Sequence, residues 1–278
     1  MDREGHDGGD GGDGPLGIRG AGAVRVLVLR NPGKRNAIAP GLHEAMRRAL
    51  DAARDDPAVG ALVLTGADGY FCSGGDLGVL ATRHALPPAE RRARIENLHG
   101  MVRALRDCPK PVVAAVEGGA AGAGMSLALA CDLLVAARDA RFSVAYARVG
   151  LTPDGGITGF LAAALPRQLL AEWCLTGDPI GAERLHALGI ANRLAAPGAV
   201  EVEALAIAAR LAAGPQRALG RIKALCHAAH GSGLDAQLDR EADAMAESQA
   251  DAEAAEGMAA FRERRAPDFA ALRAGPAG

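Results

Sequence analysis

The stretch from Val112 to Asp132 limits what this chain can fold into more than any other part of the sequence. It begins with the apolar run Val112 to Val116, which predicts a buried strand, and an apolar helical segment follows at 125–130. Between them, residues 118–124 are all glycine or alanine. A tight turn between a strand and a helix leaves backbone N–H groups unpaired at the helix N-terminus. Such a turn either binds an anion or a developing oxyanion, or saves space where a crossover packs tightly against a sheet, and this stretch alone favours neither interpretation.

The chain on either side of this stretch alternates between strand and helix patterns. Residues 23–29 and 60–65 predict strands with an amphipathic helix, beginning at Pro40, between them. The two strands should therefore be parallel and joined by a right-handed crossover. We predict an α/β core over residues 19–199 and a helical C-terminal region over 200–278. The other predicted segments are helices at 91–106, 160–175, 182–188, 200–213, 216–230, 234–250 and 253–264, and strands at 132–136, 142–144 and 190–194.

Composition excludes several classes of partner. The net charge of −2 and the aromatic content of 3% argue against binding to nucleic acid or to an anionic membrane. The five cysteines are scattered without a CxxC pair, which predicts reduced thiols in a cytoplasmic protein and no metal site. No apolar run reaches the roughly 20 residues of a membrane span. Residues 1–18 are rich in glycine and aspartate and lack the apolar core of a secretory signal, so we predict a disordered, mobile tail.

Two glycine-rich turns, at 73–75 and at 118–124, each follow a predicted strand. Neither has the GxGxxG spacing of a dinucleotide site or the GxxxxGK[ST] spacing of a phosphate-binding loop, and the chain has no GxSxG nucleophile motif. Two such turns together can direct one N–H each at a single oxygen atom.

Five motifs occur in an order that identifies a family. They are Lys34–Ala37, Phe71–Leu77, residues 116–132, Gly150–Gly156 and Glu256–Phe269. The sequence resembles the crotonase superfamily, the enoyl-CoA hydratase/isomerase family, over residues 20–270, and it is similar to members that act in aromatic-acid degradation.

The resemblance implies a core of repeated ββα units and a C-terminal helical region that makes a homotrimer or a dimer of trimers. It also implies an acyl-CoA thioester as substrate, with coenzyme A as part of that substrate and no separate cofactor. By motif matching, the backbone N–H groups of Ser73 and Ala123 hold the thioester oxygen and stabilise an enolate. Each such donor is worth ~3 kcal/mol of transition-state stabilisation.

Other positions match residues that contact the substrate in the family. Arg35 and Ala37 match the loop that lines the CoA end, while Phe261 and Arg264 match C-terminal positions that approach CoA, in some members from a neighbouring subunit. Asp76 is expected to cap or fix the loop that it follows. The remaining matched positions lie in the two turns and are Gly74, Gly75, Leu77, Ala121 and Gly122.

The chain departs from a typical hydratase of the family at both catalytic glutamates. Those positions align with Ser126 and Tyr146, and a tyrosine with a pKa near ~10 is a hydrogen-bond donor rather than a base at neutral pH. One carboxylate remains in a matching loop, Asp154. Isomerases that look similar in this loop use an aspartate there to shuttle a proton between carbons, so Asp154 is the predicted proton shuttle. The structural alternative is that Asp154 only forms an Asx-turn ahead of Gly155.

Three hypotheses about function follow from these residues. The first is double-bond isomerisation through a thioester enolate, with Tyr146 orienting water or substrate. The second is true hydration with Asp154 activating water, and the third is a protein that binds CoA thioesters without catalysis. Residues 78–92, which include His84, are predicted to be a mobile segment near the pocket entrance that sets acyl specificity.

Overall fold

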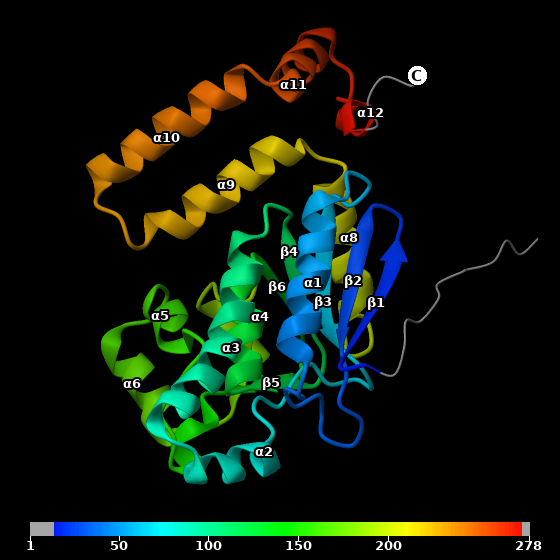
Figure 1. Cartoon of the computed structure of the whole chain (residues 1–278). Coiled ribbons are helices and arrows are strands. Elements are labelled where there is room, and N and C mark those ends of the chain that lie inside the picture. The colour runs from blue at the N-terminus through cyan, green and yellow to red at the C-terminus, as the bar shows by residue number, and fades with distance from the viewer. Residues whose placement is uncertain (1–13, 274–278) are drawn as a thin grey trace, which may run out of the picture.

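A six-stranded sheet runs through the protein in the computed structural model, which describes residues 14–273 (Figure 1). The strand order is β1-β2-β3-β4-β6-β9, and every neighbouring pair is parallel except β1 with β2. The pairing of β2 with β3 confirms that these two strands are parallel, as predicted from the sequence. The strands are β1 (Leu16–Ala21), β2 (Val24–Leu29), β3 (Ala61–Gly66), β4 (Val112–Val116), β6 (Leu133–Ala137) and β9 (Arg193–Ala195).

A second, three-stranded sheet is built from β5 (Gly119–Ala121), β7 (Arg141–Ser143) and β8 (Ile180–Gly181). Strand β4 continues into β5 and then into helix α4 (Ala123–Ala130), and β6 likewise continues into β7. These are the repeated ββα units that the resemblance implies, so the predicted fold class is confirmed. Strands β5 and β8 were not predicted, because segments of two or three residues carry no periodic pattern.

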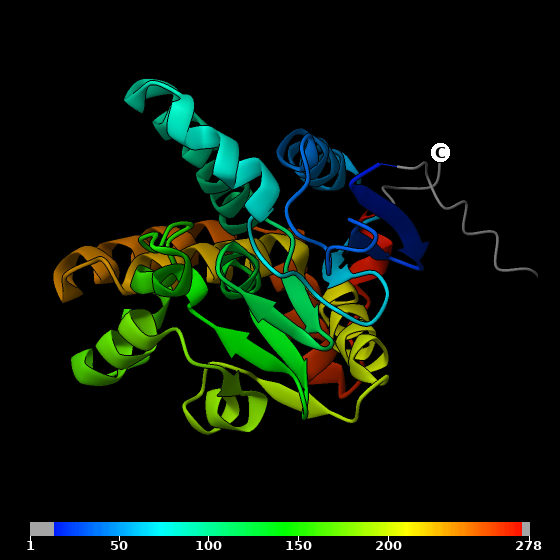
Figure 2. The same cartoon turned by 90° about the horizontal axis from the view of Figure 1, so that it is seen from below.

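Helices cover both faces of the large sheet. Helix α1 (Leu42–Asp55) lies on one face beside α3 (Pro88–Asp107), and α8 (Val200–Ala212) packs against β3, β4 and β6 on the other (Figures 1 and 2). After Val200, the buried residues of α8 are Ala204, Ala208 and Ala212, whose small side chains let the helix lie close to the strands. Helix α8, which opens the predicted C-terminal helical region, therefore packs on the core sheet, and the domain boundary at residue 199 stays a prediction.

Three long helices, α9 (Gln216–Ala229), α10 (Leu234–Gln249) and α11 (Ala252–Glu263), lie beyond one end of the sheet (Figure 1). The short helix α12 (Phe269–Arg273) follows α11. Strand β5 and helix α2 (Leu77–Thr82) lie at the opposite end of the molecule (Figure 1). The described residues after Val200 contain no strand, as predicted.

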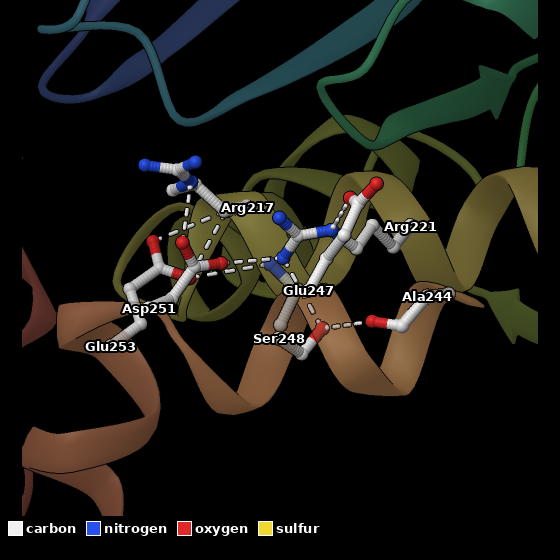
Figure 3. Close-up of polar contacts among 8 residues, drawn as sticks. Arg217, Arg221, Ala244, Glu247, Ser248, Asp251 and Glu253 are labelled. Atoms are coloured by element: carbon white, nitrogen blue, oxygen red, sulfur yellow. Dashed lines mark hydrogen bonds and ion pairs between the residues drawn. The ribbon is translucent and has the colours of Figure 1, made fainter. Parts of the chain in front are cut away.

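A cluster of charged side chains fixes the turn between α10 and α11 on the N-terminal end of α9 (Figure 3). The buried Glu253 carboxylate accepts the backbone N–H groups of Arg217 and Ala218 at 3.1 and 3.2 Å, which caps α9. Asp251 forms ion pairs with Arg217 and with Arg221. The cluster satisfies the free N–H groups of α9 and joins three helices that have few buried apolar residues.

Several sequence predictions need correction. Residues 16–18 belong to β1 rather than to a mobile tail, because Leu16 is buried and pairs with Leu29; residues 1–13 of that tail lie outside the described part of the chain. The segment 78–92 forms α2, the 3₁₀ turn Arg83–Ala85 and the first turn of α3, since Pro88 occupies the first position of a helix instead of disrupting one.

Two predicted helices also begin or end differently. The helix predicted at 160–175 divides into α5 (Ile157–Ala162) and α6 (Arg167–Thr176), because Pro166 cannot continue a helix. Helix α1 begins at Leu42 after Gly41, whose φ is 80°, rather than at Pro40. The remaining predicted strand at 190–194 is β9, and the helix predicted at 182–188 is α7 (Ala182–Ala187).

Acid should weaken the C-terminal region through Glu256. Its carboxylate accepts two bonds from Arg265, at 2.6 and 2.9 Å, and the Asp268 N–H at 2.8 Å. The Arg265 guanidinium lowers the pKa of Glu256 from 4.5 to about 2. The ionised Glu256 carboxylate therefore contributes fully to folding stability above pH 4.5, and this contribution is lost as the pH falls toward 2. We therefore expect Glu256→Gln to lower the melting temperature at pH 7 and to differ less from the parent near pH 3.

Circular dichroism melts at both pH values measure this difference, with Glu172→Gln as the control. Glu172 is an exposed side chain on α6 that forms no ion pair in the described structure. If Glu256→Gln lowered the melting temperature equally at pH 7 and pH 3, the stabilisation could not be assigned to the ionised Glu256 carboxylate.

Candidate active site

The turn after β3 and the turn that opens α4 lie against each other. The Cys72 carbonyl oxygen accepts the Ala121 N–H at 3.0 Å, and the Cys72 N–H donates to the Gly119 carbonyl oxygen at 3.3 Å. Glycine is needed at the contact, since a Cβ on Gly74 would lie 2.6 Å from the Ala121 carbonyl oxygen and one on Gly124 would lie 2.3 Å from the Cys72 carbonyl oxygen. The small residues of both turns thus allow two segments of backbone to approach more closely than side chains would permit.

The hydrogen-bond partners of the first turn show which donors are occupied in this structure. The Ser73 N–H donates to the Arg35 carbonyl at 2.9 Å, and the Ser73 hydroxyl donates to the Lys34 carbonyl at 2.9 Å. Ser73 is therefore bonded to the neighbouring loop here, and its role as an oxyanion donor stays a prediction. The Gly74 N–H is directed at the Cys72 sulfur at 3.4 Å.

Two backbone donors of these turns remain free. Within residues 14–273 no acceptor takes the N–H of Gly75 or the N–H of Ala123, which is the first residue of α4. The Ala123 nitrogen lies 3.3 Å from the position that a Cβ on Gly74 would occupy, so the two free donors are close neighbours. The Gly122 N–H donates to Ser143 at 3.0 Å instead. Gly75, rather than Ser73, is the available partner of Ala123.

The loop at residues 34–37 supports the first turn from the other side. Asn36 is buried, and its amide donates to the carbonyl oxygens of Ala67 at 2.8 Å and Tyr70 at 2.6 Å. The side-chain carbonyl oxygen of Asn36 accepts the backbone N–H of Asn31 at 3.1 Å. Arg35 and Asn36 both have positive φ, at 49° and 54°, a conformation that asparagine tolerates better than most residues.

Asn36 was not predicted as a site residue. The available signal was an asparagine within a loop of turn-forming residues, but only the structure shows that its side chain spans from this loop to the turn after β3.

The other predicted residues of these loops have defined contacts. The Asp76 carboxylate accepts the Gly78 N–H at 2.9 Å and pairs with Lys34 at 2.6 Å, which confirms the predicted cap and lowers the pKa of Asp76 through the Lys34 hydrogen bond. The Arg35 guanidinium lies 5.4 Å from the centre of the Tyr70 ring. Ala37 is buried, while Leu77 at the start of α2 is 60% exposed.

A second cluster joins Asp154 to the two positions that replace the usual glutamates. The Tyr146 hydroxyl donates to the Asp154 carboxylate at 2.7 Å, and the Ser126 hydroxyl donates to the Asp154 backbone carbonyl at 3.1 Å. Burial, followed by the charge of Asp154, raises the pKa of Tyr146, so its phenol remains a donor. A Cβ on Gly122 would lie 3.7 Å from the Tyr146 ring, which places this cluster beside the free Ala123 N–H.

The contacts of Asp154 also decide between the two interpretations of that residue. In the described structure no backbone N–H donates to its carboxylate, so the Asx-turn interpretation is wrong. Gly155 adopts a φ of 63°, and a Cβ there would lie 2.8 Å from the side chain of Ser126. The backbone at Gly155 therefore lies directly against the Ser126 side chain, and this contact requires glycine at position 155.

Some predicted residues do not join the site. Phe261 is 86% exposed on α11, at the opposite end of the molecule from β5 and α2 (Figure 1), and Arg264 follows α11 at that same end. His84 is exposed, with its ring nitrogen 2.6 Å from the Ala81 carbonyl oxygen. Burial raises the pKa of Cys72 to about 12, which keeps it a thiol.

Between residues 14 and 273 no cluster of three potential metal ligands occurs. Within the same range, no helix has the length and apolar character needed to cross a membrane.

Comparison with known proteins identifies the family that the five sequence motifs indicate. The family model described as enoyl-CoA hydratase/isomerase matches residues 19–271. The chain is 34% identical to a 1,2-epoxyphenylacetyl-CoA isomerase from Escherichia coli, covering 88% of this chain and 94% of that protein. It is 37% identical to a probable enoyl-CoA hydratase from Rhodobacter capsulatus, covering 88% and 93%. The crystal structure of an enoyl-CoA hydratase from Polaromonas sp. JS666 superposes with a TM-score of 0.89 at 42% identity, covering 92% of this chain and 99% of that one.

Removal of the Asn36 side chain should destabilise the site and the fold together. Asn36→Ala leaves the half-buried Tyr70 carbonyl oxygen and the Asn31 N–H without a partner, and it removes one of the two donors to the Ala67 carbonyl oxygen. This loss should lower the free energy of unfolding by about 1–3 kcal/mol. Urea denaturation measures this loss. Asn97→Ala on α3 is the matched control, because the half-buried Asn97 side chain forms no hydrogen bond in the described structure. Equal stability of the two variants would show that the Asn36 bonds contribute little.

Proposed function

The chain belongs to the enoyl-CoA hydratase/isomerase family, and we propose that it is an isomerase that moves a carbon–carbon double bond of an acyl-CoA thioester through an enolate. One observation carries this proposal. Next to the adjacent free N–H groups of Gly75 and Ala123 lies a cluster whose single carboxylate is Asp154. The neighbouring side chains of that cluster, Ser126 and Tyr146, are both neutral donors.

The proposed role of the two N–H groups is to hold the thioester oxygen. Loss of a proton from carbon next to the thioester places negative charge on that oxygen. Donors already aimed at the oxygen stabilise this charge without reorganisation, and each contributes ~3 kcal/mol. Gly75 and Ala123 suit this role because neither N–H has to leave a protein acceptor when the substrate binds.

Asp154 is proposed to move the proton. Its carboxylate takes a proton from C2 of a 3-enoyl thioester, the electron pair of that C–H bond forms the C1–C2 double bond of a dienolate, and the carbonyl π pair moves onto the thioester oxygen. As the carbonyl re-forms, the C1–C2 pair shifts to C2–C3, and the C3–C4 π pair takes the same proton at C4, which leaves the double bond between C2 and C3. One carboxylate completes this cycle, because it ends in the protonation state in which it began.

The residues at positions 126 and 146 support isomerisation over hydration. A hydratase with two glutamates needs carboxylates at both positions, whereas this chain has Ser126 and Tyr146 there, and both side chains act as neutral donors. The names of several relatives nevertheless keep hydration as the second candidate, among them a crotonyl-CoA hydratase that is 31% identical. In that alternative Asp154 alone would activate the water.

Binding of the coenzyme A part is proposed to involve Arg35 and Ala37 beside the first turn, with no further cofactor. Phe261 is far from this site within its own chain, so it could contact CoA only from a second copy. This separation supports the proposed homotrimer or dimer of trimers.

The role of Asp154 can be tested with 3-enoyl- and 2-enoyl-CoA in deuterium oxide. Asp154→Asn should lower double-bond migration by at least ~10²-fold, because the amide cannot accept and return a proton. Mass spectrometry and proton NMR follow the position of the double bond, the incorporated deuterium and any 3-hydroxyacyl product. The exposed Asp139, whose side chain has no partner in the described structure, provides Asp139→Asn as the control.

Each result separates the candidate functions. Migration without hydration supports the isomerase, whereas formation of a 3-hydroxyacyl thioester by the parent protein supports hydration. Full turnover by Asp154→Asn would exclude Asp154 as the shuttle. Binding of the thioesters without exchange at any carbon would support a binding protein that lacks catalysis.

A further inference from the structure

Tyr146 holds one oxygen of Asp154 from a buried position. Its hydroxyl lies 2.7 Å from Oδ1 of Asp154 and 3.4 Å from the backbone carbonyl oxygen of the same residue. The Tyr146 side chain is 8% exposed and belongs to the 3₁₀ turn Ala145–Val149. Oδ2 of Asp154 accepts no hydrogen bond from any described residue.

We propose that Tyr146 is a positioning residue that fixes Oδ1 of Asp154, so that Oδ2 alone receives the proton from the substrate and returns it. This inference rests on the proposed function, because it requires Asp154 to be the shuttle. Tyr146 itself exchanges no proton in the reaction: its O–H bond stays intact while the substrate proton moves to Oδ2 and back to carbon.

The first argument is the orientation of the carboxylate. An aspartate side chain can rotate so that either oxygen faces the substrate, and a protonated carboxyl that rotates can release its proton to water. A short hydrogen bond at Oδ1 removes this freedom. The backbone of Asp154 is also held, because its carbonyl accepts the Ser126 hydroxyl at 3.1 Å. Both ends of the residue are therefore fixed by buried hydroxyl groups.

The second argument is the charge balance around the carboxylate. In the described part of the chain no lysine, arginine or histidine lies within ion-pair distance of Asp154. The groups that face it are the hydroxyls of Tyr146 and Ser126, and only the Tyr146 hydroxyl contacts a carboxylate oxygen. A hydrogen bond to the charged form favours that form, so Tyr146 helps Asp154 give the proton back.

The third argument is the rigidity of Tyr146. Its carbonyl oxygen accepts the Leu151 N–H at 3.0 Å, which closes the loop that leads to Asp154. Its ring lies against Gly122, where a Cβ would come within 3.7 Å of it. Since Gly122 directly precedes Ala123, the tyrosine sets the carboxylate in a fixed place relative to the free N–H of the second turn. Burial raises the pKa of Tyr146, so the phenol remains protonated and donating.

The test compares Tyr146→Phe with the parent in the migration assay. Loss of the hydroxyl should reduce kcat by about 10- to 100-fold while KM stays within about twofold, because the hydrogen bond acts on the carboxylate and not on the substrate. The acidic limb of the kcat–pH profile should move to higher pH. In deuterium oxide the fraction of product carrying solvent deuterium should rise, because the freed carboxyl can rotate and exchange its proton.

The matched control is Tyr70→Phe, since Tyr70 is the other of the chain's two tyrosines and its hydroxyl forms no hydrogen bond in the described structure. The ring beside Arg35 remains in that variant, so we expect parental kcat, pH profile and deuterium content. A loss of folded protein in Tyr146→Phe would appear as a lower active fraction with an unchanged pH profile and unchanged deuterium content.

An Asp154→Asn arm separates this inference from the proposed function. If Asp154→Asn is inactive while Tyr146→Phe matches the parent in pH profile and deuterium content, Asp154 is the shuttle and the positioning role of Tyr146 is overturned. If Asp154→Asn retains full turnover, both proposals fail. Loss of activity in Asp154→Asn, together with a shifted profile and increased exchange in Tyr146→Phe, is the result that we expect.

Discussion

The close contact between the turn after β3 and the turn that opens α4 is the constraint on which the rest of the site depends. Cys72 exchanges backbone hydrogen bonds with Gly119 and Ala121, so two segments about fifty residues apart in sequence run side by side. Glycine at 74 and 124 is required because a Cβ at either position would meet backbone atoms. The contact brings the free N–H groups of Gly75 and Ala123 together. The two interpretations of the small-residue stretch, as an oxyanion site and as a space-saving crossover, are therefore compatible.

Hydrogen bonds and an ion pair from neighbouring loops hold the two turns in place. Asn36 connects the loop at 34–37 to the segment that precedes the first turn, and the pair of Lys34 with Asp76 connects the same loop to the residue that caps α2. On the other side, Ser126 and Tyr146 hold Asp154 beside the second turn. The carboxylate and the N–H groups are thus supported by different elements of one rigid core, which is the arrangement that proton transfer next to a stabilised oxyanion requires.

The sequence predicted the family and the fold class, but it did not reveal the hydrogen-bond partners on which the geometry of the site depends. Ser73 and Gly75 lie two residues apart in one motif, and motif matching alone did not tell which N–H is free. The Arg35 carbonyl occupies the Ser73 donor, and that contact depends on a loop with two consecutive residues of positive φ. Similarly, Pro87 and Pro88 suggested a mobile segment, although proline is well suited to the first turn of a helix.

Residue type and periodicity by themselves determined the alternation of strands and helices and the glycine-rich turns after two strands. The resemblance to the family added that Ser126 and Tyr146 replace two expected glutamates. These are local properties, set by side-chain size, backbone freedom and the presence or absence of a carboxylate. Only the tertiary structure decided which donors remain free, that Tyr146 and Ser126 both act on Asp154, and that Phe261 lies far from the turns. The physical reason is that a backbone N–H or a carboxylate becomes available or committed only through its partner in space, and that partner lies on another element of the fold.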